Sequence, residues 1–250
     1  MPENFKNYFV LVFDRPFKYT AAVTDGNIDA SSLSSTSNHS GAIVGFSTKR
    51  GEQVNVRVAS SFISPEQALL NLKELGDDGI DEVSARGRAR WNEVLGSCGG
   101  LRRQHRQLRT FYSCLYRSLL FPRSFYETDA DGRVMHYSPY NGKVLPGYMF
   151  TDTGFWDTFR SLFPFLNLMY PSMNEKMQEG LVNAYKESGF LPEWASPGHR
   201  GCMVGNNSAS VVADAYLKGL RGYDAETLWE AVKHGARRPS KVSSTGRLGF

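Results

Sequence analysis

The pattern of hydrophobic and polar positions changes near residue 63. Before it, β-branched and aromatic residues gather in stretches such as YFVLVF, and Val54, Val56 and Val58 alternate with polar residues. Alternation with a repeat of two is typical of β-strands. The stretch at 25–42 is dominated by Ser, Asn, Asp and Gly and predicts a loop. We expect about four strands in this region, too few to close a β-sandwich.

A helical repeat begins directly after this region. Ser64, Pro65 and Gln67 are typical of a helix start, with a capping hydroxyl, a proline at the first helical position and a Gln three residues after the cap. A second helix is predicted to run through Trp91. The stretch CGGL then separates this helical linker from the rest of the chain.

Beyond residue 103 the pattern is helical. The first helix places its apolar residues on one face, namely Leu108, Phe111, Tyr112, Leu115, Tyr116 and Leu119. Further helices are predicted near 153–169, 173–188, 206–220 and 224–236. About five helices in hairpins would form only part of an α/α toroid, which needs about twelve. Because the β region and the helical region both lack partners, we expect the chain to be part of a longer protein.

Composition and charge narrow the classes of function. Hydrophobic residues make up 41% of the chain and the net charge is +4, a soluble composition with too little charge to indicate nucleic-acid binding. The basic stretches SARGRARW and LRRQHRQLR are interpreted as solvated helix faces, with a phosphate-binding patch as the alternative. No run approaches the roughly 18 apolar residues of a membrane span. The chain has three cysteines, which match no metal-binding spacing, and its first residues do not form a signal peptide.

The long connection at 121–152 is of the kind that carries function, and the stretch TDTGFWDTFRSLFPFLNL follows it. Asp152 or Thr153 is expected to cap a core helix, which places Trp156 and Asp157 in its first turn. A Trp beside a carboxylate suits a sugar, because the ring covers an apolar C–H face and the carboxylate accepts hydroxyl hydrogen bonds. Arg160 would orient Asp157 or contact a hydroxyl. The alternative is a capped core helix with an internal Asp–Arg pair.

A second stretch, GFLPEWASPGHRGCMVGNNS, has a similar character. Trp194 lies in a loop, and Asn206 or Asn207 is expected to cap the helix that follows. Two Trp-bearing loops at the same ends of successive hairpins would face one pocket. The alternative is a pair of tryptophans that only pack.

Glu193 and His199 are further candidates in this stretch. Glu193 with Asp157 would suit glycoside hydrolysis, which needs two carboxyl groups across the scissile bond. His199 is interpreted as a loop histidine without a special role. No Ser/His/Asp signature, HExxH motif or phosphate loop is present.

Several motifs together resemble glycoside hydrolase family 92. Three stretches resemble the catalytic region of that family: FWDTFRSLFPFLNLMYP, GFLPEWASPGHRGCMVGNNS and VVADAYLKGLRGYD. Three further stretches resemble the part of the family between its β-sandwich and its barrel: SSFISPEQALLNL, ARWNEVLG and TFYSCLYRSLLFPRSFYETD. The motifs occur in the family's order over residues 40–250, and the first 40 residues resemble late strands of its N-terminal β-sandwich.

The resemblance implies a multidomain β + α fold. Residues 1–63 would be the C-terminal part of a β-sandwich domain, residues 64–100 a helical linker, and residues 101–250 the first half of an (α/α)6 barrel that is the catalytic domain. It also implies a periplasmic or extracellular protein.

The implied activity is that of an exo-acting α-mannosidase. Such an enzyme releases terminal mannose from N-glycan-type α-mannosides by inverting hydrolysis and needs calcium, which helps to bind and distort the mannose. By motif match, the resemblance implies that Asp157 and Trp194 would hold this mannose and that Trp156, Arg160 and Asn206 would lie near it.

The family's general acid, base carboxylates and calcium ligands lie in later stretches of the barrel. We therefore expect no catalytic and no metal-binding residue on this chain, and calcium only in the full-length enzyme. Glu193 matches a family position that need not be acidic, so we no longer interpret it as the acid. The alternative function is that of a non-catalytic carbohydrate-binding module.

Overall fold

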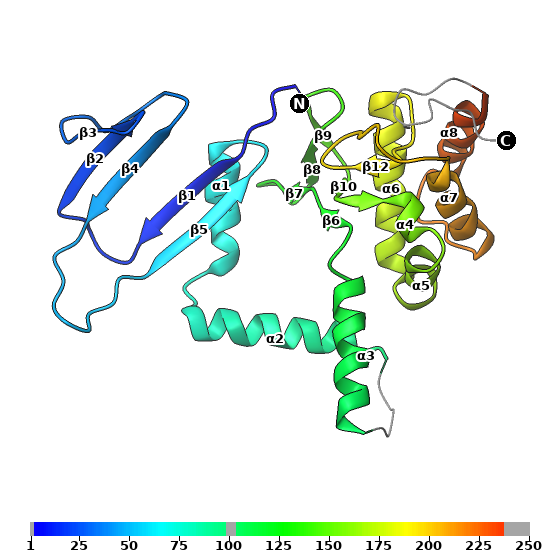
Figure 1. Cartoon of the computed structure of the whole chain (residues 1–250), viewed down its shortest axis with the longest axis horizontal. Coiled ribbons are helices and arrows are strands. Elements are labelled where there is room, and N and C mark those ends of the chain that lie inside the picture. The colour runs from blue at the N-terminus through cyan, green and yellow to red at the C-terminus, as the bar shows by residue number, and fades with distance from the viewer. Residues whose placement is uncertain (1–2, 99–103, 238–250) are drawn as a thin grey trace. The chain divides into compact units, whose positions relative to one another are not determined.

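The computed structural model describes residues 3–98 and 104–237 of the chain. The chain divides into two compact units, one formed by Phe9–Ser60 and a larger one drawn from Met1–Tyr8 and Ser61–Phe250. Small sheets occupy the start of the chain and helices dominate its later part (Figure 1). The fold is therefore of the mixed α+β class, as the sequence predicts at this level.

The smaller unit contains two small sheets. In one, β1 (Tyr8–Phe13) pairs with β5 (Val56–Ser61). In the other, which is antiparallel, β2 (Tyr19–Thr24) lies between β3 (Asn27–Asp29) and β4 (Ser40–Gly45). The region thus holds five strands rather than about four.

The predicted loop at 25–42 is wrong in part, because β3 lies inside it and β4 begins inside it. Asp25 and Gly26 have φ values of 48° and 87°, and they connect Thr24 to Asn27, which pair with each other. An Asp–Gly pair favours the tight hairpin turn that requires positive φ at both residues. This turn sends the chain back along β2 despite the loop-like composition that follows.

The alternating valines of β5 form a strand whose apolar face is open. Val56 and Val58 are 48% and 53% exposed, and Phe9 and Leu11 of β1 are exposed as well. The repeat of two therefore predicts the strand correctly, whereas its apolar face is uncovered in the part of the chain that the structure describes.

The predicted helix start at Ser64 is confirmed. α1 (Pro65–Leu72) begins at the proline, and the Ser64 hydroxyl accepts a hydrogen bond from the backbone N–H of Gln67 at 3.1 Å. This bond satisfies one of the N–H groups that have no partner inside the helix. A short 3-10 turn leads to α2 (Ile80–Gly96), and α3 (His105–Ser118) follows.

The long connection at 121–152 is folded into short strands. An antiparallel sheet contains β7 (Glu127–Thr128), β8 (Val134–Tyr137) and β9 (Val144–Pro146). A second pair joins β6 (Arg123–Ser124) to β10 (Phe150–Thr151). The Glu127 carboxylate accepts hydrogen bonds from the Phe62 N–H at 2.8 Å and from Asn71 Nδ2 at 2.7 Å, which ties the first sheet to α1.

The predicted helix at 153–169 is interrupted. Residues Thr153–Gly154 form β11, and two helices follow, α4 (Phe155–Thr158) and α5 (Leu162–Met169). Pro164 explains the break between the helices. It has no N–H to donate to the Arg160 carbonyl, and its ring would clash with that carbonyl in a continuous helix.

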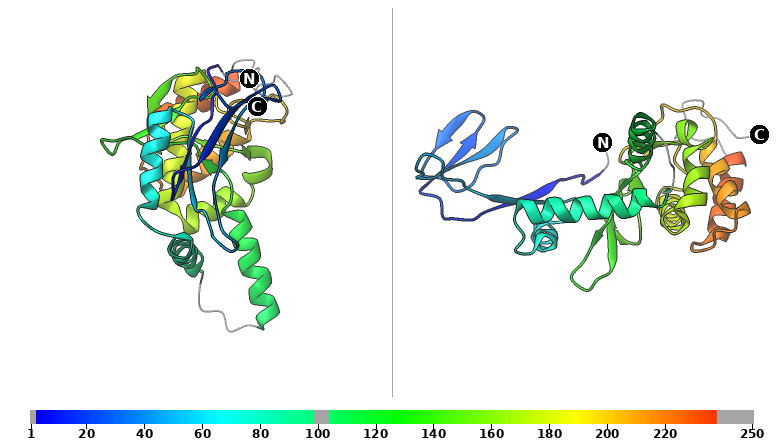
Figure 2. Two further views of the ribbon diagram at one scale, coloured as in Figure 1. Left: turned by 90° about the vertical axis from the view of Figure 1, so that its left-hand side faces the viewer. Right: turned by 90° about the horizontal axis from the view of Figure 1, so that it is seen from below.

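The other predicted helices are confirmed as α6 (Pro171–Ser188), α7 (Asn207–Leu217) and α8 (Ala225–Arg237). They pack with α5 around one apolar core, and Figures 1 and 2 show them side by side. The described residues show packed helices rather than a closed barrel. None of the helices within residues 3–98 and 104–237 is both long and apolar enough to cross a membrane.

A chain of buried amides fixes how α5, α6 and α7 meet. Gln178 Nε2 donates to Asn174 Oδ1 at 3.3 Å, and both side chains are fully buried on α6. Asn174 Nδ2 donates to Asn167 Oδ1 on α5, and Asn167 Nδ2 donates to Asp214 Oδ2 on α7 at 2.8 Å. Because each buried polar group is costly without its partner, sliding α5 along α6 or α7 would break the bond that joins it to that helix.

We expect Asn174→Leu to destabilise the larger unit. Leucine has a similar volume but leaves the Asn167 Oδ1 and Gln178 Nε2 atoms buried without this partner, at about 1–3 kcal/mol each. Urea denaturation followed by circular dichroism should show the free energy of unfolding fall by about 2–5 kcal/mol. Asn92→Leu, at an exposed position of α2, is the matched control and should change it by less than about 0.5 kcal/mol. Equal stability of the two variants would show that the amides do not hold the helices.

Candidate functional site

A two-residue ladder joins the two Trp-bearing stretches of the sequence. β11 pairs antiparallel with β12 (Trp194–Ala195), and the register places Gly154 opposite Trp194 and Thr153 opposite Ala195. Side chains alternate along a strand, so the buried Thr153 and Ala195 share one face of the ladder. Trp194 lies on the other face, next to the start of α4.

Asp157 and Trp194 meet at Gly154. A Cβ atom placed on Gly154 would lie 2.5 Å from Asp157 Oδ2 and 2.5 Å from Trp194 Cε3, far inside van der Waals contact. The carboxylate and the indole ring therefore lie against the same side of one glycine. The structure thus brings together the two residues that the sequence places in one pocket.

Gly154 itself is a site residue that the sequence did not predict. Its φ of −102° is accessible to any residue, so the missing side chain provides space rather than a special backbone conformation. A glycine in a strand often marks a close approach by another group. Its position directly before the stretch FWD was the available signal.

The Asp157 carboxylate has no partner among the residues that the structure describes. Asp157 is exposed, and no hydrogen bond or ion pair reaches its carboxylate from the residues that the structure describes. Arg160, the expected partner, donates from Nη1 to the Trp156 carbonyl oxygen at 2.7 Å. Its guanidinium carbon lies 4.3 Å from the Phe159 ring centroid and 5.1 Å from that of Trp156. The Asp157 carboxylate is therefore free to accept hydrogen bonds from a ligand.

The predicted cap of this helix is wrong. The Asp152 carboxylate accepts a hydrogen bond from Ser196 Oγ at 2.9 Å, and the Thr153 hydroxyl is buried without a partner among the described residues. Because β11 is held in strand pairing, the helix begins only at Phe155. The Phe155 N–H donates to the Glu193 carbonyl oxygen at 3.0 Å, a bond from a distant part of the chain.

Trp156 and Asn206, the other predicted site residues, do not contact the pair formed by Asp157 and Trp194 through any hydrogen bond that the described residues show. Trp156 is 43% exposed, with the Arg160 guanidinium over its ring. Asn206 directly precedes α7, and its Nδ2 lies 3.6 Å from the point that a Cβ on Gly235 of α8 would occupy. The Asn206 side chain makes no capping bond, and Asn207 Nδ2 donates to the Val204 carbonyl oxygen, so the predicted asparagine cap is wrong.

Glu193 caps α7 instead. The residue is 3% exposed, and its carboxylate accepts hydrogen bonds from the Asn207 N–H at 2.8 Å, the Ser208 hydroxyl at 2.6 Å and the Ser208 N–H at 3.4 Å. Burial raises the pKa of Glu193 to about 7, although hydrogen bonds from Ser208 and Asn207 favour the charged form. With both oxygens used by the helix, Glu193 is a structural residue.

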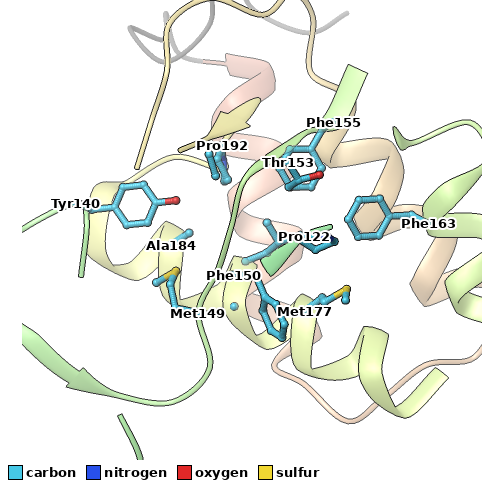
Figure 3. Close-up of a pocket in the computed structure, with 13 residues that line it drawn as sticks. Pro122, Tyr140, Met149, Phe150, Thr153, Phe155, Phe163, Met177, Ala184 and Pro192 are labelled. Atoms are coloured by element: carbon cyan, nitrogen blue, oxygen red, sulfur yellow. The ribbon is translucent and has the colours of Figure 1, made fainter. Parts of the chain in front are cut away.

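A small apolar cavity lies behind the ladder (Figure 3). Its volume is about 20 Å³, and Thr153, Phe155, Phe163 and Ala195 are among its lining residues. A cavity of this size holds about one water molecule, not a monosaccharide. The candidate ligand site is instead the place beside Gly154 where the Asp157 carboxylate and the Trp194 ring meet.

Within residues 3–98 and 104–237, no three side chains from His, Cys, Asp and Glu lie together in a way that could hold a metal ion. The described residues therefore do not fit the calcium ion that the motifs imply for a complete enzyme.

Family comparison decides the classification of the chain. Residues 1–61 match the family described as "Glycosyl hydrolase family 92 N-terminal domain", and residues 67–249 match "Glycosyl hydrolase family 92 catalytic domain". The chain belongs to glycosyl hydrolase family 92. The resemblance of its motifs to this family is thus confirmed.

Two solved structures from Bacteroides thetaiotaomicron resemble this family 92 chain. The inverting mannosidase BT2199 has a TM-score of 0.91 at 46% identity, over 96% of this chain and 33% of that one. The α-mannosidase BT3965 has a TM-score of 0.80 at 29% identity, over 92% of this chain and 32% of that one, and it has also been solved with mannoimidazole. An uncharacterized secreted glycosidase of Arthroderma benhamiae is 28% identical over 79% of this chain and 22% of its own length. The chain thus spans about a third or less of these relatives.

We expect Glu193 to make the stability of this family 92 chain fall as pH rises. Its pKa is about 7 in the folded chain against an ordinary value of 4.5, so between these values the folded chain holds a proton that the unfolded chain has lost. The contribution of Glu193 to the free energy of unfolding should therefore decrease over this pH window, by on the order of 3 kcal/mol.

Urea midpoints of the wild type and of Glu193→Gln, measured across this window, isolate the effect. His199, whose pKa burial lowers to about 4, titrates in the opposite sense but is present in both chains. The stability of Glu193→Gln relative to the wild type should rise with pH, whereas Glu226→Gln, at an exposed carboxylate, should follow the wild type. An unchanged difference between wild type and Glu193→Gln would contradict the assignment.

Proposed function

We propose that this chain supplies part of the sugar-binding site of an exo-acting α-mannosidase. The observation that carries the proposal is the meeting of the unpartnered Asp157 carboxylate with the Trp194 ring across Gly154. Membership of glycosyl hydrolase family 92 and the similarity to two mannosidases, one of them solved with mannoimidazole, support it. The substrates would be N-glycan-type α-mannosides, cleaved at their terminal mannose.

The two residues would hold mannose in complementary ways. The Trp194 ring would cover the apolar C–H face of the sugar, and the Asp157 carboxylate would accept charge-assisted hydrogen bonds from its hydroxyls. Arg160 uses Nη1 for the Trp156 carbonyl oxygen, which leaves other guanidinium N–H groups for a sugar hydroxyl. We propose that Trp156, Arg160 and Asn206 lie near the bound mannose rather than holding it as Asp157 and Trp194 do.

The bond-breaking groups would come from outside this chain. In an inverting glycosidase, one carboxylic acid protonates the leaving oxygen and a carboxylate activates water on the opposite face. Glu193 does not fill either role, because its carboxylate caps α7. Calcium in the complete enzyme would help to bind and distort the terminal mannose, through ligands that are also outside this chain.

The same proposal assigns each part of the chain to a domain of the complete enzyme. Residues 1–63 would be the last part of an N-terminal β-sandwich, residues 64–100 a helical linker, and residues 101–250 the first half of an (α/α)6 barrel. The open apolar face of β1 and β5 suits a sandwich whose other strands belong to the rest of the protein.

A non-catalytic carbohydrate-binding module is the alternative. The exposed Asp157 and the half-buried Trp194 would suit it equally. The two functions differ in one observation: a protein that contains this chain together with the remaining family 92 length should hydrolyse aryl α-mannosides in the first case and only bind mannose in the second.

We expect Asp157→Asn to lower kcat/KM in such an enzyme by about ten- to a hundredfold. The change keeps the size of the side chain but removes a charge that strengthens hydrogen bonds to mannose, each worth roughly 1.5–3 kcal/mol. The melting temperature should change little, because Asp157 has no partner among the described residues. Initial rates on an aryl α-mannoside, with calcium present, measure the effect.

Asp81→Asn is the matched control, since Asp81 is an exposed carboxylate in the first turn of α2. Like Asp157 it lies in a first helical turn, and because it is not part of the candidate site it should leave kcat/KM unchanged. Unchanged kcat/KM in Asp157→Asn, with a lowered melting temperature, would instead assign Asp157 to the stability of the helix.

A further inference from the structure

The chain folds back directly after Trp194. Ala195 pairs with Thr153 of β11 on one side and forms an antiparallel bridge with His199 on the other. The Arg200 N–H donates to the Trp194 carbonyl oxygen at 2.9 Å. The turn at 195–199 is therefore attached to the backbone of Trp194 itself.

One side chain of this turn reaches α6. His199 Nε2 lies 2.8 Å from Ser188 Oγ, at the last residue of α6. The His199 ring also packs on Tyr140, with centroids 4.6 Å apart and an angle of 53° between the planes. His199 is thus held on two sides.

Its neighbours determine which ring nitrogen carries the proton. Ser188 Oγ lies 2.7 Å from the Ala184 carbonyl oxygen and 2.9 Å from that of Phe190. A hydroxyl has one hydrogen and carbonyl oxygens only accept, so Ser188 donates to a carbonyl and accepts from the His199 Nε2–H. Nδ1 is then unprotonated, and it is buried without a partner among the described residues.

Two hydrogen bonds join the turn to the residues just before β11. Thr151 Oγ1 donates to the Pro197 carbonyl oxygen at 3.1 Å, and Ser196 Oγ donates to Asp152 Oδ1 at 2.9 Å. Both partners directly precede β11. The turn is therefore held from the β11 side by these bonds and from the α6 side by His199.

We propose that His199 is a positioning residue for the sugar site: by anchoring the turn after Trp194 to α6, it keeps the indole ring against Gly154 and beside Asp157. The ring of His199 acts through Trp194 and is not assigned a contact with sugar. The link to sugar binding rests on the proposed function, whereas the effect on Trp194 is a property of the chain without ligand.

Fluorine NMR of the chain labelled with 5-fluorotryptophan tests this directly. The chain has four tryptophans, and Trp194→Phe assigns the resonance of interest. We expect His199→Leu, which keeps bulk but loses the donor, to shift or broaden the Trp194 resonance and to leave those of Trp91 and Trp229 in place. His199→Gln should restore the resonance, because its amide N–H again donates to Ser188. His105→Leu, at an exposed position of α3, is the control.

Binding of mannoimidazole, measured by calorimetry on an enzyme that contains this chain with the same substitutions and with calcium present, forms the second arm. His199→Leu should raise Kd about tenfold and His199→Gln by no more than about twofold, as expected for losing and keeping one orienting hydrogen bond. No binding by the wild-type enzyme would contradict the proposed function, and the fluorine spectra would still decide the role of His199.

An unchanged Trp194 resonance in folded His199→Leu would overturn the positioning role. If that variant fails to fold, Ser188→Ala removes the acceptor while keeping the imidazole, and the same shift of the Trp194 resonance is expected. A resonance that His199→Gln does not restore would also contradict the role of the hydrogen bond.

Discussion

The candidate site depends on one buried residue, Glu193, which directly precedes β12 and is bonded to α4 and α7. Its carbonyl oxygen accepts the Phe155 N–H at the start of α4, and its carboxylate accepts hydrogen bonds from Asn207 and Ser208 at the start of α7. A buried carboxylate is costly unless such donors satisfy it. Because Trp194 is the next residue in the chain and Asp157 lies in α4, the bonds that hold Glu193 also fix where the ring and the second carboxylate stand.

The carboxylates of Glu193 and Asp157 have opposite surroundings. Glu193 is buried and every contact it makes is with the protein, whereas Asp157 is exposed and has no partner in the described residues. Because Gly154 has no side chain, the Asp157 carboxylate lies beside the Trp194 ring. The carboxylate oxygens remain free to accept hydrogen bonds there. Free acceptors next to an aromatic face are the features that a sugar requires, with its hydroxyls at the edge and its C–H groups on the face.

Patterns of neighbouring residues predict much of the fold. Most of the wrong predictions arise where residues far apart in the sequence pair with each other. The cap at Ser64 and the helices beyond Pro171 follow from residues within a few positions, and so they were predictable. Caps at Asp152 and Asn206 were also locally reasonable, but strand pairing with β12 and the carboxylate of Glu193 replaced them. The sequence indicates that Asp157 and Trp194 have suitable chemistry, yet their meeting depends on a ladder between residues about 40 positions apart, which no local pattern specifies.

A double-mutant cycle between Asp157 and Trp194 tests most directly whether they form one sugar site. The kcat/KM for an aryl α-mannoside would be measured in an enzyme that contains this chain, for the wild type, Asp157→Asn, Trp194→Phe and the double variant. If both residues hold the same mannose, their effects should depart from additivity by about 0.5–3 kcal/mol. Effects that add to within about 0.3 kcal/mol would contradict a shared site.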